Sequence, residues 1–135
     1  MKRRVAITGL GVVSPLGIGL EAFWTNLMAG KSGISTITSF DITDFPVKIA
    51  GEVKNFDLSE FIEDKKSIRH MDRNSQFALA AAIMAAKDAG FDISKEEAGR
   101  VGTFIGTGIG GISTTEATIT PVSYTHLTLP TTPYV

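Results

Sequence analysis

The sequence predicts an α/β fold, in which short strands alternate with helices along the chain. Two apolar, strand-like runs each lead directly into a glycine cluster, at Arg4–Gly11 and at Val101–Gly111. Two segments with helical spacing of apolar residues, Leu20–Ala29 and Arg73–Ala89, lie between them. This alternation indicates layered packing with at least partly parallel strand pairing. Two strong strands are too few to form a stable sheet by themselves.

Length, charge and cysteine content exclude several classes of function. A chain of 135 residues forms one domain or part of one, and its net charge of −1 gives no case for binding nucleic acid or an acidic membrane. No apolar run reaches transmembrane length, and Val5–Val13 makes a poor signal peptide, so we expect a cytoplasmic protein. With no cysteine and two histidines, we expect no thiolate nucleophile, no metal and no cofactor in this chain.

The N-terminal third predicts one strand and one helix. Arg4–Thr8 is a strand that the glycine turn Gly9–Gly11 ends, and Gly11–Gly19 is predicted to be a loop because it contains Ser-Pro and further glycines. Leu20–Ala29 follows as a helix, and Gly30 occupies the position after its end. Phe23, Trp24, Leu27 and Met28 recur at helical spacing, and this apolar stripe predicts that Trp24 packs in the core.

A long connection follows this helix. Lys31–Ile49 is interrupted by glycine, aspartate and proline, and predicts at most one brief strand. Ala50–Val53 suits a second short strand. Loops of this length in a compact domain often face a partner or carry function.

The middle of the chain combines a basic segment with the clearest helix. Leu58–His70 is amphipathic, and its basic residues indicate either a solvated surface or a patch for an acidic partner. Asp72 is a good N-cap for the helix Arg73–Ala89. Phe77–Ala86 contains no polar residue, which predicts burial on every side and close approach of neighbours to its alanines. Ser94–Glu97 has the pattern of a capping box and predicts another short helix.

The second glycine turn has two interpretations. Val101–Gly111 predicts a strand and turn, and the capping box Ser113–Glu116 predicts the start of a helix. Gly106, Gly108 and Gly111 fit the G-x-G-x-x-G pattern of dinucleotide-binding proteins. That site needs an acidic residue about twenty positions further on, and none follows Glu116. A small nucleotide-binding module therefore stays open as an alternative function.

The last residues differ from the rest of the chain. Ala117–Val135 contains no charged residue if His126 is counted as neutral, and three of the five prolines, and helical periodicity stops at about Pro121. Val122–Thr132 resembles the translation of a sequencing adapter. We expect residues 1–120 to be native and residues 121–135 to be a non-native tail, with a genuine extended tail as the alternative.

Four blocks of the sequence together resemble one enzyme family. In chain order they are Val5–Gly17, Gly30–Ile34, Arg69–Asp72 and Phe104–Gly111. They resemble the β-ketoacyl-acyl carrier protein synthases, condensing enzymes of the thiolase superfamily, and among these the type II synthase that extends medium and long acyl chains. The resemblance implies the N-terminal portion of a layered, thiolase-like α/β fold that works as a homodimer.

The resemblance also implies the reaction. In this family an acyl group moves from acyl carrier protein to a cysteine, two histidines assist decarboxylation of malonyl-acyl carrier protein, and the resulting carbanion attacks the thioester. The family's cysteine and histidines lie further along than this chain reaches, and His70 is not one of them. We therefore expect no condensing activity from this chain alone.

Two features of the enzyme fall within this chain by resemblance. Ile109 matches an apolar residue that gates the acyl channel, although it could equally be a turn residue packed beneath a sheet. Lys65, Lys66 and Arg69 match or neighbour the basic positions that receive the acidic acyl carrier protein. A related condensing enzyme, such as a polyketide synthase subunit or a partner without the cysteine, is an alternative that downstream residues would distinguish.

Overall fold

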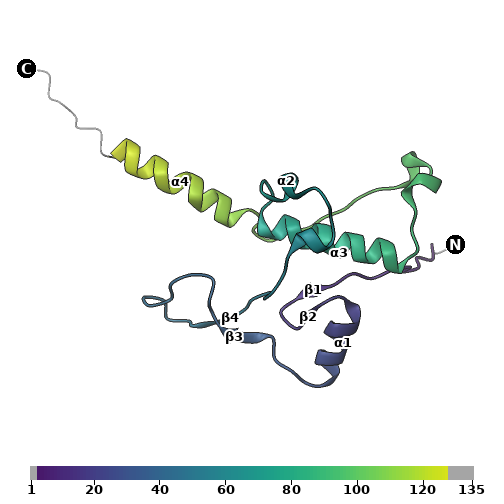
Figure 1. Cartoon of the computed structure of the whole chain (residues 1–135), viewed down its shortest axis with the longest axis horizontal. Coiled ribbons are helices and arrows are strands. Elements are labelled where there is room, and N and C mark those ends of the chain that lie inside the picture. Colours follow the sequence, from purple (N-terminus) through teal and green to yellow (C-terminus); the bar gives the residue numbers. More distant parts are fainter. Residues whose placement is uncertain (1–2, 128–135) are drawn as a thin grey trace, which may run out of the picture.

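The computed structural model describes residues 3–127 as an open assembly of short helices and two small hairpins (Figure 1). Its helices are α1 (Leu20–Met28), α2 (Lys65–Ile68), α3 (Arg73–Asp88) and α4 (Ile112–Leu127). Its strands are β1 (Val13–Ser14), β2 (Gly17–Ile18), β3 (Ile34–Thr36) and β4 (Ile49–Gly51). Three 3₁₀ turns, η1 (Leu58–Glu60), η2 (Ile93–Lys95) and η3 (Ala98–Arg100), complete the elements.

The strands form two separate antiparallel pairs. Val13 faces Ile18 in the β1–β2 pair, and Ile34 faces Gly51 in the β3–β4 pair. Between residues 3 and 127 no strands pair in parallel, so the predicted parallel pairing is wrong for this part of the chain. Parallel strands need a crossover and a neighbour distant in sequence, whereas a hairpin needs only a local turn.

The strand predicted at Arg4–Thr8 does not form. These residues are extended but have no strand partner among the described residues, and Val5 and Ile7 are 93% and 81% exposed. The predicted loop Gly11–Gly19 instead contains the β1–β2 hairpin. The Ser14 hydroxyl closes this hairpin by donating to the Gly17 carbonyl at 3.1 Å and accepting from the Leu16 amide at 3.2 Å.

Helix α1 confirms the predicted segment, and Gly30 ends it with a φ of 65°. The predicted burial of Trp24 is wrong, because its side chain is 57% exposed. Among the other elements of the described chain, helix α1 packs mainly against β2, a strand of two residues, and this small contact leaves much of its apolar stripe uncovered.

The long connection contains the predicted brief strand as β3, and the second short strand forms as β4, which begins one residue earlier than expected. Glu52 fixes the loop between them. Its carboxylate accepts hydrogen bonds from the Thr38 amide at 3.0 Å, the Thr38 hydroxyl at 2.9 Å and the Ser39 amide at 2.9 Å.

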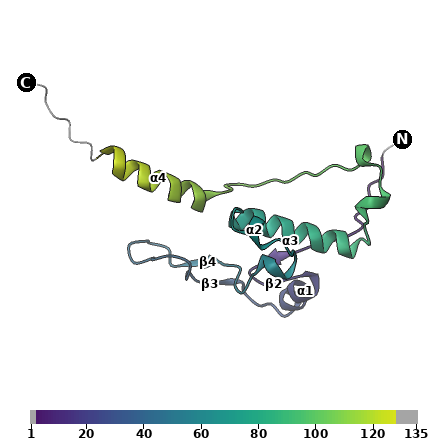
Figure 2. The same cartoon turned by 45° about the horizontal axis from the view of Figure 1, so that its top comes forward.

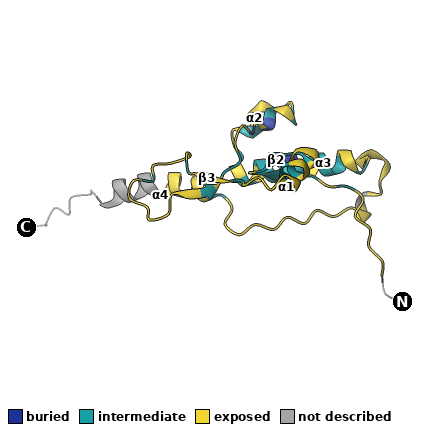
Figure 3. Ribbon diagram, turned by 90° about the horizontal axis from the view of Figure 1, so that it is seen from below, coloured by how far each residue is buried: buried dark blue, intermediate teal, exposed yellow. Residues whose placement is uncertain are grey.

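The core is small and lies between η1 and α3. Phe56, Leu58 and Ala80 are its buried residues, at 7%, 1% and 0% exposure. Within Phe77–Ala86 only Ala80 is buried, so the predicted burial on every side is wrong for the described chain (Figure 3). The main packing partners of α3 are β1 and η1, and these small elements leave most of residues 77–86 only half-buried.

Helix α3 confirms the close approach predicted for its alanines. The N-terminal segment crosses it so tightly that a Cβ on Gly9 would lie 2.3 Å from the Ala85 carbonyl oxygen. The Leu10 amide donates to the Asp88 carboxylate at 2.9 Å. Glycine is needed at residue 9 because no side chain fits between the two backbones.

After α3, Gly90 ends the helix with a φ of 61°. The capping box predicted at Ser94–Glu97 is wrong, because Asp92 is the cap and its carboxylate accepts from the Ser94 amide at 3.1 Å. A turn of three residues follows instead of an α-helix. Asp92 caps the turn in place of Ser94, because an aspartate that precedes a turn can accept a hydrogen bond from the amide two positions further on.

Val101–Gly111 is extended rather than a strand, which corrects the prediction. This segment runs back along the length of α3 without pairing to another described strand (Figure 2), and Phe104 is 98% exposed. Helix α4 begins at Ile112 and continues to Leu127, so the helix break predicted at about Pro121 is wrong. The remainder of the expected non-native tail, residues 128–135, lies outside the described residues.

Candidate functional site

The turn that carries Ile109 meets the N-terminal end of α3. A hollow of about 220 Å³ lies there, between the starts of α3 and α4. Its lining combines the apolar side chains of Phe77, Ile109 and Ile112 with the polar start of α3, and consists of Asp72, Arg73, Asn74, Phe77, Ile109, Gly111, Ile112 and Ser113. Ile109 itself is 77% exposed.

Two polar side chains from the start of α3 hold this turn. The Gly111 amide donates to the Asn74 side-chain oxygen at 3.3 Å, and the Thr114 hydroxyl donates to the Asp72 carboxylate. Gly111 has a φ of 68°, which only glycine adopts without strain. We call these two contacts the Asp72–Asn74 clasp.

Asp72 differs from its sequence-based interpretation. It precedes α3 in extended conformation, as an N-cap residue does, but its side chain makes no capping hydrogen bond to α3. Its carboxylate instead bonds Thr114, which is 42 positions away in the sequence. Sequence reasoning missed this partner, and also missed Asn74, because no local pattern marks a contact across that separation.

The glycine turn does not have the geometry of a dinucleotide site. A Cβ added to Gly106 or Gly108 would meet nothing within 4 Å, so no close backbone approach explains these glycines. No strand precedes the turn within the described residues, and the G-x-G-x-x-G fingerprint requires one.

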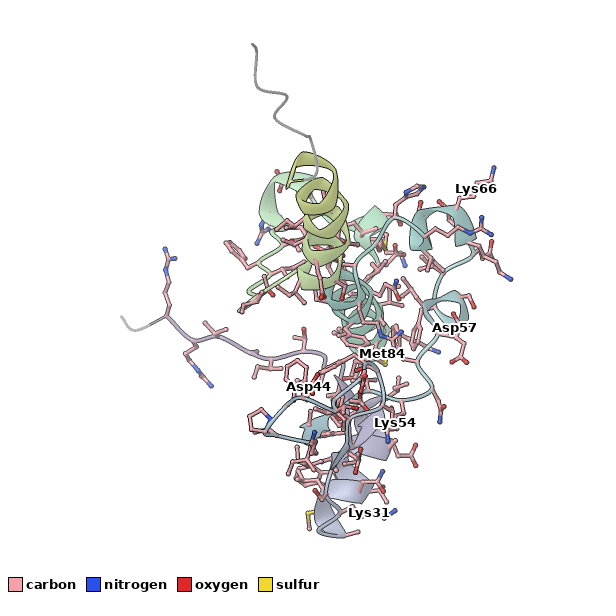
Figure 4. All side chains as sticks on the ribbon, turned by 90° about the vertical axis from the view of Figure 1, so that its left-hand side faces the viewer. Lys31, Asp44, Lys54, Asp57, Lys66 and Met84 are labelled. Carbon is pink, nitrogen blue, oxygen red and sulfur yellow. The ribbon has the colours of Figure 1, made fainter. Side chains whose placement is uncertain are left out.

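The basic residues lie on one exposed segment. Lys65 and Lys66 belong to the single turn of α2, and Arg69 ends it. All three are exposed, and none forms an ion pair with another described residue. Ile68, the last residue of α2, packs against the core and so anchors the segment. Figure 4 shows Lys66 at the outer edge of the molecule, far from Lys31.

Asp64 fixes the start of this basic segment. Its carboxylate accepts from the Lys66 amide at 3.0 Å and from the Ser67 hydroxyl at 2.5 Å. The Ser67 hydrogen bonds, followed by that of Lys66, lower the pKa of Asp64 below its usual value. The charge of this carboxylate is thus directed at α2 backbone amides, while the lysine side chains remain free to contact solvent.

The basic segment and the Ile109 turn do not share a pocket, but both adjoin the N-terminal end of α3. The Met71 carbonyl accepts from the Gln76 side chain at 3.0 Å, which ties the end of the basic segment to the first turn of α3. Asp72, the next residue, accepts a hydrogen bond from Thr114 in the first turn of α4. The start of α3 is therefore a junction between the two predicted functional features.

Residues 3–127 contain no group of three or more histidine, cysteine, aspartate or glutamate side chains placed to hold a metal ion. Within the same range, no helix combines the length and apolar character needed to cross a membrane.

Comparison with known proteins identifies the family. A family model described as the N-terminal domain of β-ketoacyl synthase matches residues 2–132, and the chain belongs to this family. Among curated proteins, it is 52% identical over 111 residues to 3-oxoacyl-[acyl-carrier-protein] synthase 2 of Coxiella burnetii, covering 82% of this chain and 27% of that protein. The synthase 2 of Vibrio harveyi is 47% identical over 116 residues, covering 86% of this chain and 28% of that protein.

A solved structure resembles the chain in its fold as well. The ishigamide ketosynthase/chain length factor is 40% identical, with a TM-score of 0.64 over 70% of this chain and 23% of the other. The chain thus spans just over a quarter of the length of the curated relatives described above. The family resemblance inferred from the four sequence blocks is confirmed.

Proposed function

We propose that this chain is the N-terminal part of a 3-oxoacyl-[acyl-carrier-protein] synthase of the type II-like class, which extends acyl chains in fatty acid biosynthesis. The observation that carries the proposal is the 52% identity to a protein of that name across 82% of the chain. The reaction is a decarboxylating Claisen condensation between an acyl thioester and malonyl-acyl carrier protein. The complete enzyme would be a cytoplasmic homodimer with a layered, thiolase-like fold.

The open shape of the chain supports an incomplete enzyme. Two extended apolar segments, Arg4–Gly11 and Val101–Gly111, border α3 without strand partners among the described residues. In a layered fold such segments are strands of a sheet that covers the helix. The nucleophilic cysteine and the two histidines would come from residues beyond this chain, which itself contains no cysteine.

Within the complete enzyme, Ile109 would line the acyl channel. Its position beside Phe77 and Ile112, around a hollow of about 220 Å³, suits an unbranched hydrocarbon because the three side chains offer an apolar wall. Lys65, Lys66 and Arg69 would receive acyl carrier protein. Their exposure and lack of ion pairs among the described residues leave three positive charges available to an acidic partner.

The test is a chimera in which this chain's residues replace the matching 111-residue segment of the Coxiella burnetii relative. We expect the chimera to condense acyl and malonyl groups held on acyl carrier protein, and this chain alone to be inactive. Loss of condensation in a correctly folded chimera would refute the proposal. So would malonyl-dependent condensation by this chain alone, since that would overturn the assignment of the catalytic residues to the remainder.

The same chimera tests the docking residues. The charge reversals Lys66→Glu and Arg69→Glu should raise the apparent KM for carrier protein more than they lower kcat, and should weaken its salt dependence. Lys31→Glu is the matched control, because Lys31 lies far from α2 (Figure 4). An unchanged KM in both reversals, or an equal rise for Lys31→Glu, would count against the docking role.

A polyketide-type condensing enzyme is the second candidate. The observation that favours it is the 40% identity to the ishigamide ketosynthase/chain length factor. The uninterrupted gene would separate the candidates, because a chain length factor-like partner would lack the cysteine. Reading that gene with independent primers also tests the non-native tail. An open frame through Val122–Thr132 would show that residues 121–135 are genuine.

A further inference from the structure

We propose that Asp72 and Asn74 are positioning residues for the acyl channel, because they fix the turn that carries Ile109 and thereby set the acyl-chain length that the enzyme favours. This inference rests on the proposed function. Asp72 and Asn74 border the same hollow as Ile109, but they are polar and form no part of its apolar wall.

In the described chain, the contacts that hold the turn lie after Ile109 and not before it. Phe104 and Ile105 are 98% and 70% exposed, and the segment pairs with no strand among the described residues. Two positions after Ile109, the Gly111 amide donates to Asn74 at 3.3 Å. Three positions further, the Thr114 hydroxyl donates to Asp72. The clasp therefore grips the chain immediately after Ile109.

Gly110 and Gly111 allow the side chains of Asn74 and Asp72 to approach the turn closely. A Cβ on Gly110 would lie 2.7 Å from the Asn74 side-chain nitrogen, and a Cβ on Gly111 would lie 2.9 Å from the Asp72 carboxylate. Both side chains thus touch the turn along consecutive backbone units. Such contact leaves little freedom for the turn to slide along α3, so the placement of Ile109 depends on residues 72 and 74.

Position matters because Ile109 and Phe77 face the same hollow of about 220 Å³. Phe77 lies on α3, about one turn beyond Asn74, and does not move with the glycine turn. A shift of Ile109 relative to Phe77 changes the length of the apolar space between them. One methylene in an apolar pocket changes kcat/KM by roughly tenfold or more, so a small shift has a measurable effect on selectivity.

The experiment uses the chimeric synthase described above and compares kcat/KM for a long and a short acyl chain on carrier protein. Asn74→Ala and Thr114→Val should change the long-to-short ratio by about threefold to tenfold, with the KM for malonyl-acyl carrier protein unchanged. Thr114→Ser keeps the hydroxyl and should retain the parental ratio. Asp92→Ala is the control, because Asp92 makes similar hydrogen bonds to Ser94 beyond the far end of α3.

The outcomes separate the two proposals. If the parent chimera folds but is inactive, the proposed function is refuted, and the positioning role that rests on it is refuted as well. An active parent whose ratio is unchanged in both Asn74→Ala and Thr114→Val overturns the positioning role alone. Loss of the ratio in Thr114→Ser to the same extent as in Thr114→Val also overturns it, since the hydroxyl would then be irrelevant.

Hydrogen exchange of the folded chimera provides a second test that needs no activity. Asn74→Ala should speed exchange of the Gly111 amide by about tenfold, because that amide loses its acceptor. Exchange as slow as in the parent would show that Asn74 does not hold the turn and would overturn the proposal.

Discussion

Gly11 lies against Ala81 of α3 so closely that a Cβ on residue 11 would be 1.9 Å from the Ala81 carbonyl oxygen. The next helical turn repeats this contact, since Gly9 meets Ala85 and Ala89. Between the two glycines, the Leu10 amide donates to Asp88. Gly9 and Gly11 therefore dock on alanines of α3 and its C-cap, and Leu10 is held between them by Asp88.

Replacing Gly11 should release this docked segment. In Gly11→Ala the new methyl meets backbone atoms that cannot move aside, and we expect a cost of about 1–3 kcal/mol. The Leu10 amide should then exchange at least about tenfold faster with solvent. Gly106→Ala is the control, because no atom lies within 4 Å of its Cβ position. Equal exchange of Leu10 in the two variants would contradict the close contact.

Glu52 should titrate at unusually low pH. Hydrogen bonds from Ser39 and then Thr38 to the carboxylate lower its pKa from 4.5 to about 2. The folded-state pKa lies below the unfolded one, so this contribution to stability is complete above about pH 4.5 and is lost as the pH falls toward 2.

Carbon-13 NMR of the Glu52 carboxyl should show this midpoint, and the Thr38 and Ser39 amide shifts should follow it. In Glu52→Gln those amide shifts should no longer change over the same range. A Glu52 midpoint near 4.5 would show that the loop hydrogen bonds do not persist in solution.

Arg73 should stabilise the core because its planar guanidinium packs on two aromatic rings and donates to two backbone carbonyls. The guanidinium lies 5.0 Å from the Phe56 ring centre and 4.8 Å from that of Phe77, and donates to the Phe56 and Val53 carbonyls at 3.2 and 3.3 Å. Arg73→Lys keeps the charge but loses the stacking and the fork of donors. We expect a loss of about 1 kcal/mol.

Hydrogen exchange of α3 amides measures this loss, and Arg100→Lys serves as the control. A double-mutant cycle with Phe77→Leu should give a coupling of about 0.5 kcal/mol or more. Strict additivity of the two substitutions would show that the guanidinium and the ring do not interact.

The isolated chain should associate in solution. Trp24, Phe104 and Ile109 are 57%, 98% and 77% exposed, and the buried core of the described residues consists of Phe56, Leu58 and Ala80. Such a surface favours self-association and dye binding over a cooperative unfolding transition. Analytical ultracentrifugation and calorimetry test this expectation. A monomer with one sharp thermal transition would contradict it.

Much of the local structure could be predicted from the sequence. The helix bounds of α1 and α3, their glycine ends at Gly30 and Gly90, and the strand β4 agree with the structure within about two residues. Strand β3 lies in the long connection, where one brief strand was predicted without bounds. Caps, helical periodicity and turn residues act over a few positions, and so the sequence carries them directly.

The candidate site could be predicted only in part. Ile109 lies beside a hollow, as an apolar channel residue should, and the three basic residues are exposed on one segment, but their roles stay predictions. The sequence pattern assigns Asp72 to its own helix and gives no role to Asn74. Both bond residues at the start of α4, and no local pattern contains that information.

The sequence by itself determined α1 and α3, their glycine ends and, through four ordered blocks, the family. Tertiary structure decided whether Arg4–Thr8 and Val101–Gly111 become strands, whether Trp24 is buried, and which residue Asp72 bonds. A helix satisfies its backbone hydrogen bonds within a few residues, whereas a strand and a buried side chain need neighbours that are distant in sequence. Where the described chain offers no such neighbour, an apolar segment remains extended and exposed.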